Sequence, residues 1–102
     1  MSNVVEVVHF SLDSDCTEDD FLRTDEQMKQ FLSQQAGLIH RSLSKRDDGS
    51  FLDIIYWQNM EAATSAQQSF YASDVCKLIG QLINIESVTI EHTSVCSTLG
   101  IN

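Results

Sequence analysis

The first and last apolar segments of the chain both have the pattern of β-strands. Residues 4–10 are apolar at odd and even positions alike, which predicts a central strand covered on both faces. Residues 87–95 alternate instead, with Val88, Ile90 and His92 on one side and polar side chains on the other. This alternation predicts a strand with one buried face.

A β-hairpin is predicted in the middle of the chain. Two segments of β type, residues 38–46 and 51–58, flank a polar segment that contains Asp48 and Gly49. An Asp-Gly pair between two such segments is a strong hairpin signal. Residues 51–57 are apolar on both parities, so both faces of this strand are expected to be covered.

Two helical regions separate these strands. Thr17 can cap a helix of about twenty residues that stops at Gly37, and its apolar side chains recur at helical spacing. Asn59 can cap a second helix over residues 60–71, followed by a short helical turn that ends near Gly80.

The resulting order, β-α-β-β-α-β, predicts an α+β fold of the ferredoxin-like type, with a four-stranded antiparallel sheet and both helices on one face. The chain of 102 residues has room for one domain, which we expect to span residues 1–102. The other sheet face would be bare although residues 51–57 are apolar on both sides. We therefore expect a second copy of the chain to cover it in a homodimer. The alternative is a ligand groove or a sticky surface.

The length of the hairpin loop decides which side chains share a face. If the Asp-Gly pair forms a two-residue turn, Asp53 lies opposite Ser44 and Trp57 lies opposite His40, and opposed residues share a face. That face would be mixed, with a carboxylate and an imidazole among aromatic side chains. A three-residue turn would reverse the assignment.

Asp53 lies inside an apolar strand, where an unpartnered carboxylate is costly. Three interpretations stay open. It can be a structural group bonded to Ser44, Ser42 or a backbone amide. It can be a general base in a cavity, with its pKa raised by burial. It can also be partly exposed at the surface.

The three histidines, His9, His40 and His92, each lie on a predicted strand. Three histidines can form a metal site, but these are not spaced for local ligation and we predict no metal. Ordinary core or rim positions are one interpretation, and a catalytic acid–base role for one of them is the other. His92 shares its parity with Val88 and Ile90, so we expect it to be the most buried.

The predicted helices carry small alanines beside bulky apolar side chains. If the alanines leave space above the sheet, the bulky residues would line a mostly apolar pocket. The aromatic residues that end the third strand can instead pack in the core or a dimer interface. The predicted pocket residues are Trp57, Tyr56, Met28, Phe31, Ala66 and Phe70.

Charge argues against several classes of partner. The formal net charge is −9, from 15 acidic and 6 basic residues, and this field repels phosphate. We therefore expect no nucleic acid partner and no docking to an anionic membrane. Arg41, Lys45 and Arg46 account for three of the basic residues. They fit charge protection of an edge strand, or an anion-binding patch.

Location and cofactors follow from what the sequence lacks. Residues 1–4 do not resemble a signal peptide, and no apolar run reaches the ~20 residues of a membrane helix. Three separated cysteines suit a reducing compartment, so we expect a cytoplasmic protein. There is no glycine-rich phosphate loop or nucleotide fingerprint, and we expect no cofactor.

The segment from Gly37 to Ala66 resembles the dimeric α+β barrel superfamily, specifically antibiotic biosynthesis monooxygenase-like proteins. The residues that carry the resemblance are Gly37, Arg41, Asp48-Gly49, Tyr56-Trp57-Gln58-Asn59, Met60-Glu61-Ala62-Ala63 and Glu86-Ser87-Val88. The resemblance implies a homodimer whose sheets pack into a barrel, with a cavity in each subunit between sheet and helices. Such proteins oxidise polycyclic aromatics with oxygen and no cofactor, degrade haem, or have no known activity.

The sequence departs from the haem-degrading members of this group. Their tryptophan nine residues after the strand-end tryptophan, a histidine in many relatives, is Ala66 here. Their catalytic histidine ten residues further on corresponds to Cys76, and their first-strand asparagine has no clear match near His9. Haem degradation is therefore not expected.

Two functions stay open. The first is a cofactor-independent monooxygenase-like enzyme, or a relic of one, that acts on a small aromatic or apolar molecule. Asp53, His40 or His92 would transfer the proton, while Trp57 and Tyr56 would stack on the ring. The second is a non-catalytic dimer that binds a small ligand or a partner. The first function needs Asp53 and a histidine in one cavity.

Overall fold

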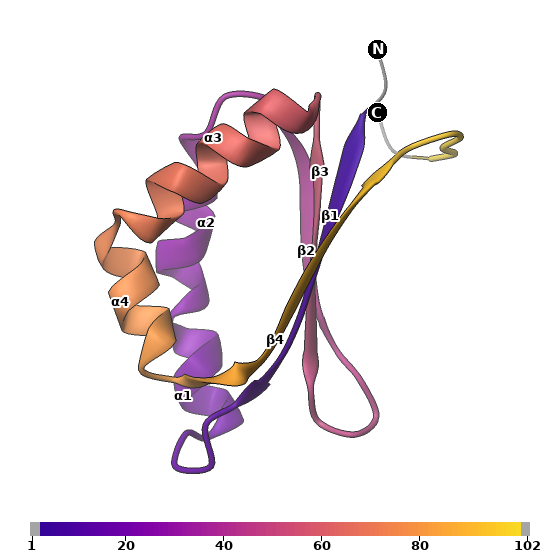
Figure 1. Ribbon diagram of the computed structural model, residues 1–102. Helices are drawn as coiled ribbons and strands as arrows, with labels where there is room; N and C mark the ends of the chain where they lie inside the picture. Colours follow the sequence, from indigo (N-terminus) through magenta and orange to yellow (C-terminus); the bar gives the residue numbers. More distant parts are fainter. Residues whose placement is uncertain (1–2, 101–102) are drawn as a thin grey trace.

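The computed structural model describes residues 3–100, which form a four-stranded antiparallel sheet with all helices on one face (Figure 1). The strands are β1 (Val4–Leu12), β2 (Leu38–Lys45), β3 (Phe51–Trp57) and β4 (Ile83–Ser94), in the spatial order β2-β3-β1-β4. The helices are α1 (Glu18–Arg23), α2 (Asp25–Ser33), α3 (Met60–Tyr71) and α4 (Asp74–Gly80). The predicted ferredoxin-like α+β fold is confirmed, and each predicted helical region contains two helices.

The first predicted helix is interrupted at Thr24. Thr17 caps α1 as predicted, because its hydroxyl accepts a hydrogen bond from the Asp20 amide at 3.1 Å. Thr24 Oγ1 then donates to the carbonyl oxygen of Phe21 at 2.7 Å, and the Thr24 amide donates to the same carbonyl. A threonine hydroxyl bonded back to the preceding turn competes with the regular helical bond and bends the helix. The region is therefore α1 followed by α2, and not one helix.

Gly37 makes the turn from α2 into β2. Its φ of +86° is in the left-handed region, as predicted for a helix stop. A Cβ atom at this position would lie 2.6 Å from the Cβ of Ala62 in α3. Glycine is needed here both for the turn and for the close approach of α3. Asn59 starts that helix as predicted, since its side chain accepts a bond from the Ala62 amide at 2.8 Å.

The β2–β3 hairpin has a three-residue loop, so the predicted register is wrong by one residue. The Arg46 amide donates to the Ser50 carbonyl at 2.7 Å, and the Gly49 amide donates to the Arg46 carbonyl at 2.9 Å. A two-residue turn of the expected type needs a positive φ at both central positions. Gly49 has a φ of +90°, whereas Asp48 does not have a positive φ. The Asp48 carboxylate instead accepts hydrogen bonds from the amide and hydroxyl of Ser50, at 2.9 and 2.6 Å.

The one-residue shift moves the polar residues of β2 to the other face. Asp53 lies opposite Leu43 and not opposite Ser44, and it shares its face with Arg41. His40 lies opposite Tyr56 and not opposite Trp57. The predicted mixed face of imidazole, serines and carboxylate therefore does not exist.

The inner face of the sheet, which the helices cover, holds two apolar clusters. Each packs at a different part of the sheet, and both contribute residues to the cavity described below. The buried members are Val4, Leu32, Ile55, Trp57, Ala63 and Ala66 in one cluster, and Phe10, Phe21 and Phe51 in the other.

The outer face of the sheet has no helix over it within residues 3–100 (Figure 1). Five apolar side chains at its centre are only half-buried. They are Val5, Val7, Leu52, Ile54 and Tyr56. The expectation that β3 is apolar on both sides, with helices on only one, is confirmed. The second copy that would cover the outer face stays a prediction.

β4 begins earlier than expected, at Ile83 instead of Ser87. Its pairing with β1 is irregular between His9 and Ser11, where the Ser11 amide donates to Ser87 Oγ at 2.9 Å. Such an irregularity lets a strand continue after its register shifts. No helix within residues 3–100 is long and apolar enough to cross a membrane.

Candidate functional site

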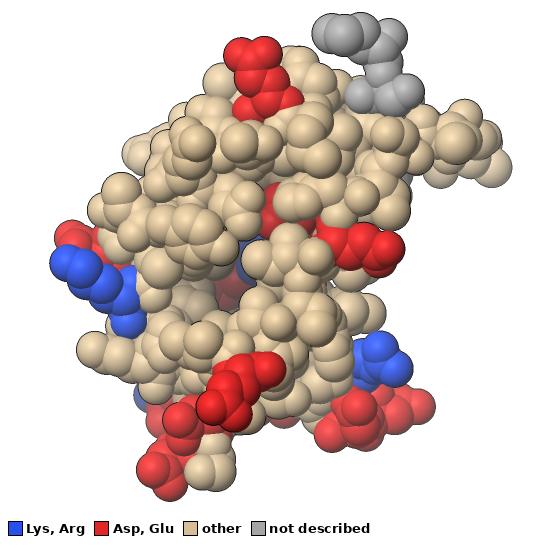
Figure 2. All heavy atoms as spheres, in the orientation of Figure 1, with Lys and Arg blue, Asp and Glu red and all other residues tan. Residues whose placement is uncertain are grey.

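A cavity of about 280 Å³ lies between the inner face of the sheet and the helices. All four strands and all four helices of residues 3–100 contribute side chains to its walls, with β2 and α1 contributing only Arg41 and Phe21. Figure 2 shows a hollow between the helices and β4, with acidic and basic side-chain atoms visible inside it. The lining is mostly apolar, so the few polar groups that reach it determine its chemistry.

The cavity brings together most of the predicted pocket residues. Those that line it are Met28, Phe31, Trp57, Ala66 and Phe70. Tyr56 does not line it, because alternate side chains of β3 point to opposite faces. Its ring lies on the outer face beside the exposed His40, with the ring centroids 6.3 Å apart. These two residues are therefore separated from the cavity by the sheet.

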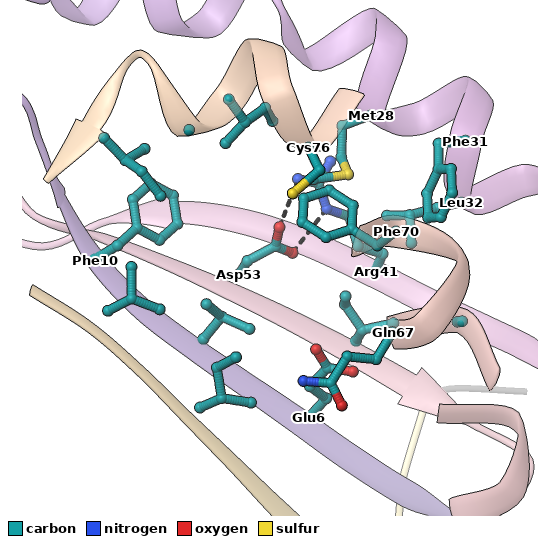
Figure 3. A pocket seen from close by; sticks show the side chains of 18 of the residues that line it. Glu6, Phe10, Met28, Phe31, Leu32, Arg41, Asp53, Gln67, Phe70 and Cys76 are labelled. Carbon is teal, nitrogen blue, oxygen red and sulfur yellow. Dashed lines mark hydrogen bonds and ion pairs between the residues drawn. The ribbon is translucent and has the colours of Figure 1, made fainter. Parts of the chain in front are cut away.

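Asp53 lines the cavity but is held by an arginine (Figure 3). The residue is 7% exposed, and its Oδ1 and Oδ2 accept hydrogen bonds from Nε and Nη2 of Arg41, both at 2.8 Å. Arg41 Nη1 also donates to Asp25 Oδ1 at 2.9 Å. Both Asp53 oxygens are therefore held in a bidentate ion pair with Arg41.

Two opposing effects act on the pKa of Arg41. Burial alone lowers the pKa of Arg41, but the hydrogen bonds and negative charges of Asp53 and Asp25 outweigh burial, and the pKa is raised. The guanidinium therefore stays charged. Its side chain is 10% exposed, so neither predicted role, as edge-strand protection or in a surface anion patch, applies to Arg41. The expected serine partners of Asp53 are also wrong, because the hairpin loop is one residue longer than predicted.

A second polar group in the cavity was not predicted. Glu6 on β1 lines the cavity, and its Oε1 accepts a hydrogen bond from Trp57 Nε1 at 3.0 Å. His92 Nε2 lies 3.5 Å from the same oxygen and is buried without a hydrogen-bond partner. Glu6 Oε2 forms no hydrogen bond within residues 3–100. We refer to Glu6, Trp57 and His92 as the Glu6 cluster.

The Glu6 cluster and the Arg41–Asp53 pair differ in whether a carboxylate oxygen remains able to accept a bond from a ligand. The Glu6 side chain is only 12% exposed, yet its two neighbours are an indole and an imidazole and not a permanent cation. Figure 3 shows Glu6 with Gln67 at a different part of the wall from Asp53 and Arg41. One oxygen of Glu6 can therefore accept a proton or a hydrogen bond from a ligand.

The signal for Glu6 was present in the sequence. Glu6 is an acidic residue at the same parity as Val4 and Val8 in an apolar strand, as Asp53 is in β3. By contrast, nothing local indicated that Asp25 would reach Arg41. That contact depends on how α2 lies over β2 and on the hairpin register.

The three histidines do not come together, and none of them lines the cavity. The expected arrangement of Asp53 and a histidine in one cavity is therefore not found within residues 3–100. His9 and His40 lie on the outer face, and His92 lies on the inner face. His9 Nε2 is 2.9 Å from Ser50 Oγ at the hairpin end. Within residues 3–100, no group of three or more histidine, cysteine, aspartate and glutamate side chains is placed to hold a metal ion.

The chain shares its four-stranded ferredoxin-like fold with solved structures of antibiotic biosynthesis monooxygenase-like proteins, which confirms the predicted resemblance at the level of the fold. SnoaB, a cofactor-independent oxygenase from Streptomyces nogalater, superposes with a TM-score of 0.77 at 17% identity, covering 98% of this chain and 99% of SnoaB. A proposed antibiotic biosynthesis monooxygenase from Bordetella bronchiseptica gives a TM-score of 0.77 at 16% identity, covering 91% of this chain and 96% of that one.

Rv0793 from Mycobacterium tuberculosis is similar too, with a TM-score of 0.76 at 14% identity and coverage of 95% of this chain and 98% of Rv0793. No protein-family model and no curated protein matches the sequence. At these identities the likeness establishes the fold of the chain, and the activity has to be argued from the cavity.

Proposed function

We propose that the protein binds a small, mostly apolar and preferably aromatic molecule in this cavity and oxidises it as a cofactor-independent monooxygenase-like enzyme. The observation that carries the proposal is the apolar cavity with the partly unbonded carboxylate of Glu6 in its wall. Concave, apolar sites with a few polar groups are typical of small-molecule binding. The similarity in fold to SnoaB, a cofactor-independent oxygenase, supports the class of reaction.

The reaction needs a base and a dry site. A base removes the proton of an aromatic hydroxyl, and the resulting electron-rich anion reacts with oxygen, while the apolar wall keeps water away. We assign the base to Glu6, because its Oε2 has no hydrogen-bond partner among the described residues. His92, beside Oε1, would then share or pass on the proton.

The other predicted catalytic residues have different places in this proposal. Asp53 orients and neutralises Arg41 and does not itself accept the proton. His40 and Tyr56 lie on the outer face and take no part in the chemistry. Met28, Phe31 and Phe70 supply the apolar wall beside Trp57.

The size of the cavity limits the ligand. Its volume of about 280 Å³ is just below the range of roughly 300–1,000 Å³ that is common for sites of drug-sized molecules. A molecule with one ring or two fused rings therefore fits the cavity better than a larger polycyclic molecule.

A defined test reaction is the oxidation of 1-naphthol. One molecule of 1-naphthol and one of oxygen give 1,4-naphthoquinone and water, so one oxygen atom enters the ring and the other leaves as water. We expect oxygen uptake and quinone absorbance to rise in proportion to protein concentration. Glu6→Gln should lower the rate by roughly 10²–10⁴-fold, the usual contribution of a positioned base.

The matched control for this assay is Glu61→Gln on α3, which removes an exposed carboxylate that does not line the cavity. Its rate should equal that of the unchanged protein. Equal rates for Glu6→Gln and Glu61→Gln would remove Glu6 from the reaction. Binding of 1-naphthol without turnover would favour the second function, a non-catalytic binding module, for which the fully paired Asp53 is the supporting observation.

We also propose that the outer sheet face joins two copies of the chain. Its apolar centre, which includes Val7 and Ile54, lacks a helix to cover it, and an exposed apolar patch of this kind is typical of an interface. Sedimentation equilibrium should give a dimer at micromolar concentration. Ile54→Lys should give monomers, whereas Gln68→Lys on the exposed side of α3 should not. A monomeric unchanged protein would contradict the proposal.

A further inference from the structure

The charged side chains that line the cavity are unevenly balanced. Three carboxylates line it, those of Glu6, Asp25 and Asp53, against the single guanidinium of Arg41. With His92 neutral, this leaves a net of two negative charges around a mostly apolar space. Such a wall favours ligands of one charge over another, since electrostatic interactions are stronger in a low-dielectric site than in water.

The positive charge of Arg41 is already compensated by two carboxylates, although two of its five N–H donors form no hydrogen bond within residues 3–100. Its Nε and Nη2 donate to Asp53, and its Nη1 donates to Asp25, so one cation already faces two carboxylates. The Nζ of Lys29 lies 4.0 Å from Asp25 Oδ2, but the Lys29 side chain is exposed and does not line the cavity. A ligand carboxylate would therefore lose its hydration without gaining a free cation, which is unfavourable.

Glu6 offers a carboxylate to which a positively charged ligand can bind. Its Oε1 accepts from the neutral indole of Trp57 at 3.0 Å, and its Oε2 has no partner within residues 3–100. A carboxylate left with a free oxygen in an apolar wall is stabilised most by a donor that also carries positive charge. A neutral hydroxyl or amide donor would bond to it more weakly.

From this charge pattern we infer that the cavity selects its ligand by charge. It binds an aromatic molecule with a protonated amine directed at Glu6 most tightly. It binds the corresponding neutral alcohol less tightly and the corresponding carboxylate most weakly. The inference rests on the proposed function only for the cavity that binds the ligand. An amine on Glu6 occupies the proposed base, so such a molecule binds in the cavity but is not the substrate of the oxidation.

Three ligands with the same ring test the selection. They are 1-naphthylmethylamine, 1-naphthalenemethanol and 1-naphthoate, which are cationic, neutral and anionic at neutral pH. Isothermal titration calorimetry of each against the unchanged protein, at one salt concentration, gives their relative affinities. We expect the amine to bind roughly ten- to hundredfold more tightly than the alcohol, as for one charge-assisted hydrogen bond, and the carboxylate to bind most weakly.

Two variants separate the role of Glu6 from that of the overall charge of −9. Glu6→Gln keeps the size of the side chain and should abolish the preference for the amine over the alcohol. Glu61→Gln makes the same change in net charge at an exposed position and should leave the ranking unchanged. An unaltered amine preference in Glu6→Gln would overturn the inference.

The two proposals fail in different ways. If none of the three ligands binds, the proposed function itself is wrong. If naphthoate binds as tightly as the amine, the cavity binds aromatic molecules but the inferred selection is wrong. This ranking is measured on the unchanged protein, so the test holds even if Glu6→Gln does not fold.

Discussion

Glu6 and Asp53 occupy equivalent places in the sheet but have different partners. Both are single acidic residues on the inner face, on the adjacent strands β1 and β3, and Glu6 lies opposite Ile55 while Asp53 lies opposite Val8. Asp53 has both oxygens bonded to a guanidinium, whereas Glu6 has one oxygen bonded to an indole and the other without a hydrogen bond in the part of the chain that the structure describes. A buried carboxylate with a cation partner is structural, and one with only neutral partners retains capacity for chemistry.

The largest expected effect comes from removing the cation. Arg41→Met leaves Asp53 buried without a partner and should lower the free energy of unfolding by about 3–5 kcal/mol. Urea denaturation followed by circular dichroism measures the loss. The double variant Arg41→Met/Asp53→Leu should recover much of it, since no unpaired charge remains. Equal losses in the single and double variants would show that the ion pair is not the cause.

Removing the acceptor of the Glu6 cluster should cost less. Glu6→Leu leaves Trp57 Nε1 buried without an acceptor, which should lower the free energy of unfolding by about 1–3 kcal/mol. Trp57 is the only tryptophan, so its fluorescence emission reports directly on this change. An unchanged emission spectrum together with unchanged stability would mean that the bond to Glu6 contributes nothing.

A conservative change at the same position should separate stability from chemistry. Glu6→Gln retains an oxygen that can accept from Trp57 Nε1, so the free energy of unfolding should change by less than about 1 kcal/mol. The oxidation rate should nevertheless fall as described above, because an amide cannot act as the base. A large loss of stability in this variant would instead make the charge of Glu6 a structural requirement, as for Asp53.

The smallest expected effect on stability comes from the charge of Asp48, in the hairpin loop that decides which residues share a face with Asp53. The hydrogen bonds from the Ser50 hydroxyl and amide hold the pKa of Asp48 below its ordinary value. A lowered pKa in the folded state stabilises the fold above the unfolded pKa, about 4, and this contribution is lost as the pH falls through the folded pKa.

Urea midpoints at a series of pH values test this linkage. The difference between the unchanged protein and Asp48→Asn should shrink between about pH 5 and pH 3, since the variant lacks the titrating group. Asp47→Asn is the matched control, because Asp47 is a neighbouring exposed carboxylate. A difference that stays constant with pH would assign the stabilisation to the loop shape and not to the charge of Asp48.

Local signals were sufficient for the order of the strands and helical regions, but not for the break at Thr24 or the start of β4. Thr17 and Asn59 cap helices where their side chains predicted, and Gly37 turns the chain into β2. Each of these features depends on a few neighbouring residues, so sequence reasoning could identify them. The order of elements and the apolar parity of β3 then led to the ferredoxin-like sheet with one uncovered face.

The sequence by itself therefore determined the order of strands and helical regions, the sheet topology and five of the residues that line the cavity. Only the tertiary structure decided the polar chemistry. Whether Asp53 meets a serine or Arg41 depends on one residue in the hairpin loop, where the φ of Asp48 and its bonds to Ser50 set the register. The Glu6 cluster likewise needs three strands in register, because its members are brought together by pairing across the sheet and not by spacing along the chain.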